Sequence, residues 1–163
     1  MRRSSPDSLS PLKAKFRDYV LELQDTLNKV ESIHVQITRA RASGMNSVVL
    51  SWGRQLSRSC RAGAAMAETT TQRMSTMLTD DARGERAMAT FRDGLAVLTE
   101  GMRTCERDDT QLMAGKTPDF KRIEEIAESA SVAVSDYRQV RDGLLPLLGI
   151  DLLLGKRSAT RVH

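Results

Sequence analysis

Apolar residues recur at alternating intervals of three and four through four segments of about thirty residues each. On an α-helix this spacing gathers the apolar side chains on one face, which then packs against other helices. The segments run from Leu12 to Ile37, from Val49 to Met77, from Met88 to Leu112 and from Phe120 to Leu144. Strand signals are nearly absent, and the β-branched residues within 47–52 are the main candidate. The sequence therefore predicts an all-α protein.

Short breaker sequences separate the four segments: Ser43-Gly44, residues 80–84, and Gly115-Lys116-Thr117. Connections this short join neighbouring helices that run antiparallel. The prediction is an antiparallel up-down-up-down four-helix bundle, with helices about 45 Å long at about 1.5 Å per residue. Ser10-Pro11 and Thr117-Pro118 each supply an N-cap oxygen followed by proline, which is a typical start of a helix.

The end of the chain is unusually apolar, since residues 144–155 read LLPLLGIDLLLG. Pro146 lacks a backbone N–H and clashes with the preceding turn, so we expect the fourth helix to stop there. A short fifth C-terminal helix is predicted over Leu147–Leu154. Residues 10–155 would then form a single domain, with a flexible N-terminal arm at 1–9 and a flexible basic tail at 156–163.

This apolar end segment would form an exposed patch if it were left in water. It would cap the open end of its own bundle, dock onto a protein partner or a second copy, or lie on an anionic membrane surface. Apolar residues also flank the main faces of the first and fourth helices, which favours self-association as a homo-oligomer. The candidate partner-binding residues are Leu144, Leu145, Leu147, Leu148, Ile150, Leu152, Leu153 and Leu154, and the flanking residues are Leu21, Ile33, Val35, Ile126, Val132, Ala133 and Val140.

The region 32–67 contains no Asp or Glu but five arginines. Such a basic stripe would bind phosphates of nucleic acid or another anionic surface. Internal ion pairs are the competing interpretation, because the expected hairpin places Arg58 opposite Glu106 and Arg54 near Asp109. Interleaved aromatic residues for base stacking are missing, which argues against binding of single strands. The candidate anion-binding residues are Arg39, Arg41, Arg54, Arg58 and Arg61.

Cys60 and Cys105 are expected on facing seams of the second and third helices. A turn centred near residue 82 pairs residue 60 with about residue 104, so the two thiols would share a layer of the core. We interpret them as buried free thiols, with a disulfide or redox pair as the alternative. Two cysteines, no apolar stretch of about 18 residues and no apolar leader are typical of a cytoplasmic protein without a transmembrane segment.

Signatures of catalysis and of cofactor binding are missing from the sequence. There is no phosphate-binding loop, no GxGxxG, no nucleophile elbow and no HExxH. Glu31 and His34 have the Glu-x-x-His spacing of carboxylate-bridged di-metal sites. The only other histidine is His163, so the ligands are too few, and we expect His34 to lie beside Trp52 in the core.

The sequence thus predicts no catalytic residue, no cofactor and no metal. The leading hypothesis is a non-enzymatic interaction or assembly protein, a scaffold that acts through its apolar helix faces and the C-terminal apolar segment. The alternative is binding of nucleic acid or an anionic surface through the Arg-rich, acid-free region 32–67.

Overall fold

A computed structural model describes residues 11–74 and 82–150 and confirms the all-α four-helix bundle. No strand occurs within these two ranges. The described chain consists of α1 (Pro11–Ala42), α2 (Asn46–Met74), α3 (Ala82–Met113), α4 (Phe120–Leu144) and a 3-10 turn, η1 (Leu145–Leu148). The predicted arm 1–9 and tail 156–163 lie outside the described residues.

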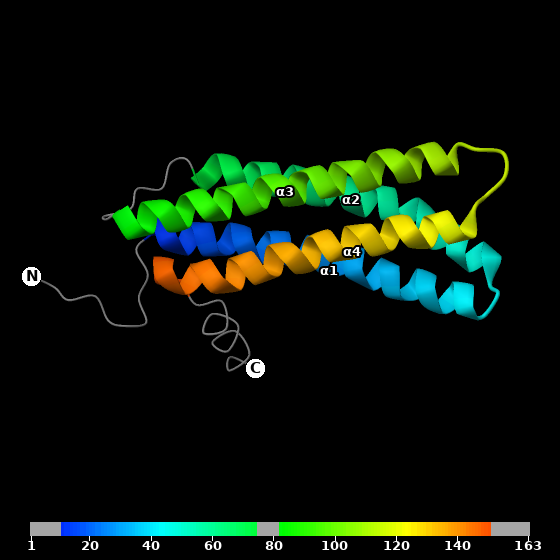
Figure 1. Ribbon diagram of the computed structural model, residues 1–163, viewed down its shortest axis with the longest axis horizontal. Helices are drawn as coiled ribbons and strands as arrows, with labels where there is room; N and C mark the ends of the chain where they lie inside the picture. Colours follow the sequence, from blue (N-terminus) through cyan, green and yellow to red (C-terminus); the bar gives the residue numbers. More distant parts are fainter. Residues whose placement is uncertain (1–10, 75–81, 151–163) are drawn as a thin grey trace, which may run out of the picture.

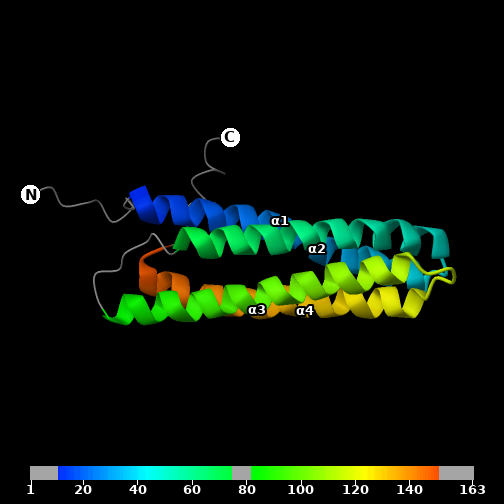
Figure 2. The same cartoon turned by 90° about the horizontal axis from the view of Figure 1, so that it is seen from above.

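Each helix packs against the next one along the chain, and α4 closes the bundle by packing against α1. Neighbouring helices run antiparallel (Figures 1 and 2). α1 and α2 form one layer of the bundle, and α3 and α4 form the other. One outer face of the bundle is therefore built from α3 and α4 alone.

The predicted apolar seams form one continuous core that includes Leu23, Leu56, Leu95 and Ile123. At the end of the bundle where α3 begins and α4 ends, Phe91 packs edge-to-face between Phe16 and Tyr137. Its ring centroid lies 5.6 Å from that of Phe16 and 5.9 Å from that of Tyr137. His34 and Trp52, which were expected in the core together, are both only half-buried.

Only the second of the two proline start signals can be compared with the structure. α1 is described from Pro11, where the described residues themselves begin, so its start at Ser10-Pro11 stays a prediction. α4 begins at Phe120 rather than after Thr117, because Asp119 is the N-cap residue and its carboxylate accepts a hydrogen bond from the Arg122 backbone N–H at 3.0 Å. Pro118 therefore lies in the loop before the helix.

The predicted fifth helix over Leu147–Leu154 is wrong where the structure describes it. The chain instead makes the 3-10 turn η1, with Pro146 in its first turn, and ends it at Gly149. Gly149 has a φ of 72°, a left-handed conformation that glycine adopts without steric cost. The Ile150 N–H then donates to the Leu145 carbonyl at 3.0 Å, which folds this segment back onto the end of the bundle.

α3 and α4 approach each other closely at two glycines of α3. A Cβ atom on Gly101 would lie 2.9 Å from the Ala133 Cβ, and one on Gly94 would lie 3.0 Å from Val140 Cγ1. Real Cβ contacts are longer than this, so the crossing requires glycine at position 101. The short separation brings the outer surfaces of the two helices together into one face.

We expect Gly101→Ala to destabilise the protein. Alanine in place of helical glycine normally adds about 0.5–1 kcal/mol of stability. At position 101 the new methyl group would meet the Ala133 Cβ, and overpacking of this kind costs about 1–3 kcal/mol. Chemical denaturation should show a lower free energy of unfolding for Gly101→Ala.

The matched control is Gly143→Ala, because a Cβ at Gly143 would have no heavy atom within 4 Å. This variant should be as stable as the wild type or more stable. Equal stabilisation by both substitutions would show that α3 and α4 are not in close contact at residue 101.

Candidate interaction surface

The structure divides the predicted partner-binding leucines between the core and the surface. Leu145, Leu148 and Ile150 are buried against the end of the bundle, and Leu144 is half-buried. Leu147 is 45% exposed. Leu152, Leu153 and Leu154 lie outside the described residues. Among the described members, Leu147 alone offers a large exposed apolar side chain to a partner, so the binding role of this segment stays a prediction.

Two of the five candidate anion-binding arginines are engaged in ion pairs with acidic residues. Arg61 contacts Glu106 at 2.6 Å, and Arg41 contacts Glu124. Arg39, Arg54 and Arg58 are exposed and make no ion pair with the described residues. Their role in anion binding stays a prediction.

The predicted pairs of Arg58 with Glu106 and of Arg54 with Asp109 are wrong. The register of α2 and α3 brings residue 60 beside residue 105, with a Cα–Cα distance of 6.1 Å. Glu106 is reached by Arg61, which forms an ion pair with it. Asp109 is buried in the core and accepts no hydrogen bond from the described residues, whereas Arg54 is exposed.

Val97 of α3 and Val132 of α4 are the most exposed large apolar side chains in the described chain, at 67% and 54%. Both line a groove of about 380 Å³ between α3 and α4. Its lining also includes Gly101, Ile126 and Ala133, which are small or apolar. We call this surface the α3–α4 face. A single exposed valine is unremarkable, but two on adjacent helices around one groove form a patch.

The apolar residues predicted to flank the fourth helix mostly pack inside the protein. Ile126 is buried, Val140 packs against Gly94, and Ala133 lies against Gly101. Val132 alone of this set is well exposed. On α1, Ile33 is buried, Leu21 is half-buried, and Val35 is 43% exposed. The greater apolar exposure is therefore on the α3–α4 face and not on α1.

Each exposed valine of this face lies between two acidic residues on its own helix. Asp93 precedes Val97 by four positions and Glu100 follows it by three, which places all three on one side of α3. Glu128 and Asp136 flank Val132 on α4 in the same way, four residues to either side. All four carboxylates are exposed, and none makes an ion pair with the described residues. The valines thus lie in a locally negative field.

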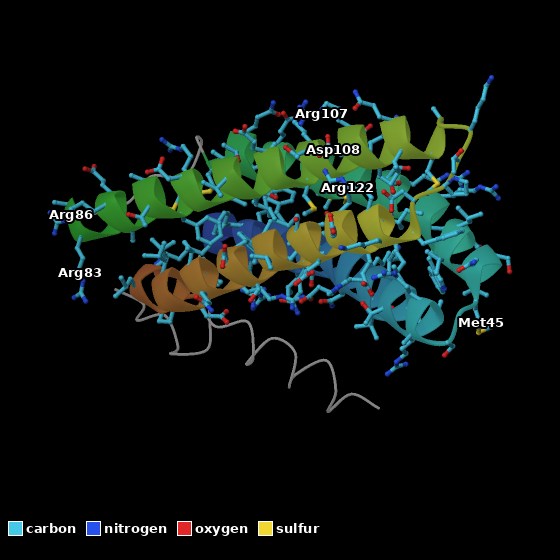
Figure 3. The ribbon with its side chains drawn as sticks, turned by 45° about the vertical axis from the view of Figure 1, so that its right-hand side comes forward. Met45, Arg83, Arg86, Arg107, Asp108 and Arg122 are labelled. Carbon is cyan, nitrogen blue, oxygen red and sulfur yellow. A yellow bond between two sulfur atoms is a disulfide. The ribbon has the colours of Figure 1, made fainter. Side chains whose placement is uncertain are left out.

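A cluster of ion pairs closes one end of the groove (Figure 3). Arg122 of α4 reaches Asp108 of α3 at 3.8 Å and Glu125 at 3.5 Å. Arg107 also contacts Asp108, at 3.3 Å. These charges neutralise one another, so the net negative charge of the α3–α4 face is concentrated around Val97 and Val132.

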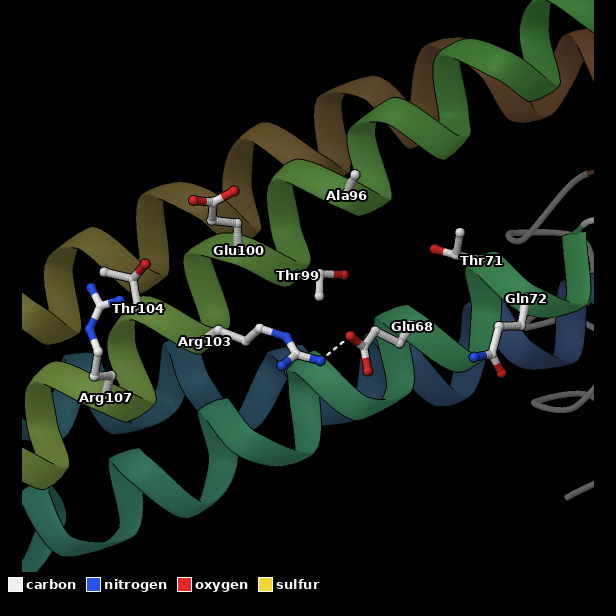
Figure 4. A pocket seen from close by; sticks show the side chains of 9 residues that line it. All are labelled: Glu68, Thr71, Gln72, Ala96, Thr99, Glu100, Arg103, Thr104 and Arg107. Atoms are coloured by element: carbon white, nitrogen blue, oxygen red, sulfur yellow. Dashed lines mark hydrogen bonds and ion pairs between the residues drawn. The ribbon is translucent and has the colours of Figure 1, made fainter.

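A second groove, of about 610 Å³, lies between α2 and α3 (Figure 4). Glu68 and Arg103 form an ion pair across it. The Thr71 and Thr99 hydroxyls donate to the carbonyls of Ala67 and Leu95 on their own helices, at 2.9 and 2.7 Å. Glu100, which also lines the groove between α3 and α4, is an unpaired carboxylate among the described residues of this second groove.

Asp109 is the one acidic residue that is fully buried within the described chain. Neither carboxylate oxygen accepts a hydrogen bond there, and the nearby Ser57 hydroxyl donates instead to the Arg54 carbonyl at 3.3 Å. Burial raises the pKa of Asp109 from 3.8 to about 6, although the polar groups of Ser57 oppose part of the rise. Burial likewise raises the pKa of the Tyr137 hydroxyl.

The residues that the structure describes contain no group of three or more metal-ligating side chains. Glu31, from the Glu-x-x-His pair, forms an ion pair with Arg138 instead. None of the described helices has the length and apolarity needed to cross a membrane.

Cys60 and Cys105 form a disulfide between α2 and α3. The interpretation as free thiols was therefore wrong, although the predicted facing of the two residues is confirmed. Their Cα–Cα distance of 6.1 Å is within the usual range for a disulfide. Disulfides are typical of oxidising compartments, whereas the sequence predicts a cytoplasmic protein. The compartment stays a prediction.

No protein-family model matches the chain, and no curated protein or solved structure shows significant similarity to it. The functional interpretation therefore rests on the residues and their geometry.

Sequence reasoning found Val132 but missed Val97, the most exposed apolar residue of the α3–α4 face. The signal was present, because Val97 is a β-branched residue between Asp93 and Glu100 on the polar side of the third apolar pattern. An apolar residue on that side is expected to be exposed and is a candidate contact.

We expect Asp109→Asn to stabilise the protein above pH 6 and to have little effect at pH 4. A carboxyl whose folded pKa lies above its unfolded value contributes stability at low pH that is lost as pH rises through about 4 to 6. A shift from 3.8 to about 6 corresponds to at most about 3 kcal/mol between the two limits. Urea denaturation across this pH range measures the difference between wild type and variant.

Asp25→Asn is the control for this experiment, because Asp25 is an exposed aspartate on α1. Its stability should follow that of the wild type at every pH. A constant difference between Asp109→Asn and wild type across the whole range would contradict the raised pKa.

Proposed function

We propose that this protein is a non-enzymatic interaction protein whose α3–α4 face binds a basic, apolar segment of a protein partner. The observation that carries the proposal is the arrangement of two exposed valines, each between two unpaired carboxylates, around one shallow groove. Val97 and Val132 supply the apolar contact. The four carboxylates select a partner that carries Lys or Arg beside its apolar residues.

The two kinds of contact contribute differently to binding. Burying an exposed valine side chain contributes on the order of 1–2 kcal/mol, so two valines and the groove between them support a weak, specific contact. The carboxylates chiefly raise the association rate and exclude acidic partners. Binding is therefore expected to be reversible and to weaken as salt screens the charges.

An amphipathic peptide of leucine and lysine, labelled with a fluorophore, tests this proposal. Fluorescence anisotropy at dilute protein should show binding that weakens with added salt. The double variant Val97→Lys and Val132→Lys should reduce the affinity at least about ten-fold, which corresponds to about 1.4 kcal/mol.

Val35→Lys is the matched control, because Val35 is an exposed valine on α1, away from the α3–α4 face. This variant should bind the peptide as the wild type does. Equal affinity of the wild type and the double valine variant would remove the basis of the proposal.

The unpaired arginines support a second candidate function, the binding of nucleic acid or another polyanion. Arg39 and Arg54 are exposed in the half of the bundle that carries the α1–α2 turn, and Arg58 is exposed near the middle of α2. None of the three makes an ion pair with the described residues. This candidate is weaker, because Arg41 and Arg61 are already paired with acidic residues of other helices.

The triple variant Arg39→Gln, Arg54→Gln and Arg58→Gln tests the second candidate. If the arginines bind phosphates, the wild type should bind duplex DNA with a steep dependence on salt, and the triple variant should lose most of that affinity. The control is Arg86→Gln with Arg92→Gln, which changes exposed arginines of α3. Absence of DNA binding at low salt, or an equal loss in the control, would reject this function.

A further inference from the structure

The chain itself contains a segment with the chemistry that the α3–α4 face favours. Leu152, Leu153 and Leu154 are followed by the basic residues Lys156, Arg157 and Arg161. These residues belong to 151–163, which lie outside the described structure. The three leucines are able to bury the two exposed valines in an apolar contact. The three basic residues are able to form ion pairs with the four unpaired carboxylates around the valines.

We propose that residues 151–163 of one copy bind the α3–α4 face of a second copy. The inference rests on the proposed function and deepens it, because it names the occupant of the same surface. A reciprocal exchange of the two segments closes the assembly as a two-fold dimer. In this dimer, residues 151–163 of each copy cover the exposed valines of the other copy's α3–α4 face.

The reach of the chain favours a second copy over the same molecule. Twelve residues of α4 separate Val132 from Leu144, which is about 18 Å along the helix. Ile150 is held at the end of the bundle by its hydrogen bond to the Leu145 carbonyl. Leu154 is four residues beyond Ile150, and its Cα extends at most about 13–14 Å from Ile150. In their own copy the leucines therefore reach the level of Val97, which lies opposite residue 137 of α4, but fall short of the level of Val132. Only in a second copy does one segment cover both valines.

Charge disfavours the simplest alternative, in which two α3–α4 faces pack directly against each other. That contact would bring Asp93, Glu100, Glu128 and Asp136 of one copy against the same residues of the other. Like charges across an interface cost binding energy when no counter-charge separates them. The basic residues of 156–161 supply that counter-charge, because they follow directly after the three leucines.

Complementation between two full-length variants tests the proposal. The face variant carries Val97→Lys and Val132→Lys, and the tail variant carries Leu152→Ser, Leu153→Ser and Leu154→Ser. Light scattering after gel filtration should show a dimer for the wild type and a monomer for each variant alone. An equimolar mixture should form a dimer, because the tail variant keeps an intact face and the face variant keeps an intact tail.

The mixed dimer retains one of the two contacts, so it should dissociate at a higher concentration than the wild type. Val35→Lys should remain dimeric, which shows that an added lysine alone does not prevent association. Because both substituted valines are exposed, circular dichroism should show an unchanged helical fold for the face variant.

A wild type that stays monomeric, or a mixture that stays monomeric, would overturn the exchange of tails. A dimer that persists in either variant would overturn it as well, because association would then depend on another surface. The leucine–lysine peptide separates these results from the proposed function. Continued peptide binding that still requires Val97 and Val132 assigns the face to a different protein, whereas loss of peptide binding removes the proposed function itself.

Discussion

The close crossing of α3 and α4 determines the character of the surface that this protein presents. A Cβ atom on Gly101 would lie 2.9 Å from the Ala133 Cβ, and a Cβ atom on Gly94 would lie 3.0 Å from Val140 Cγ1. The two helices therefore share a shallow groove, and the residues on its rim come from both of them. Val97, Val132 and the four flanking carboxylates form a single face because the helix axes are this close.

The sequence predicts the bundle well, because apolar periodicity and short breakers are local signals. Helix order and the antiparallel pairing follow from them. The helix-to-helix register does not follow, because it depends on side-chain packing between elements. Residue 60 lies beside residue 105 and not 104, and Glu106 forms its ion pair with Arg61 and not with the expected Arg58.

On the candidate surface too, the features that depend on local sequence were predictable, and those that depend on packing between helices were not. The exposure of Val97 follows from its place on the polar side of a helix, and the acidic residues around it can be read from spacing. The groove itself depends on Gly101 meeting Ala133, a contact between residues 32 positions apart. The burial of Asp109 is tertiary as well, since a carboxylate beside Asp108 in sequence is expected to be solvated.

The proposed dimer depends on one contact, in which Leu152, Leu153 and Leu154 of another copy cover Val97 and Val132. Isotope-filtered nuclear Overhauser spectroscopy tests it directly, on a mixture of methyl-labelled and unlabelled full-length chains. The account predicts intermolecular cross-peaks between the methyl groups of these leucines and those of Val97 and Val132. Cross-peaks to the two valines that arise only within one chain, or only from other residues of the second copy, would contradict it.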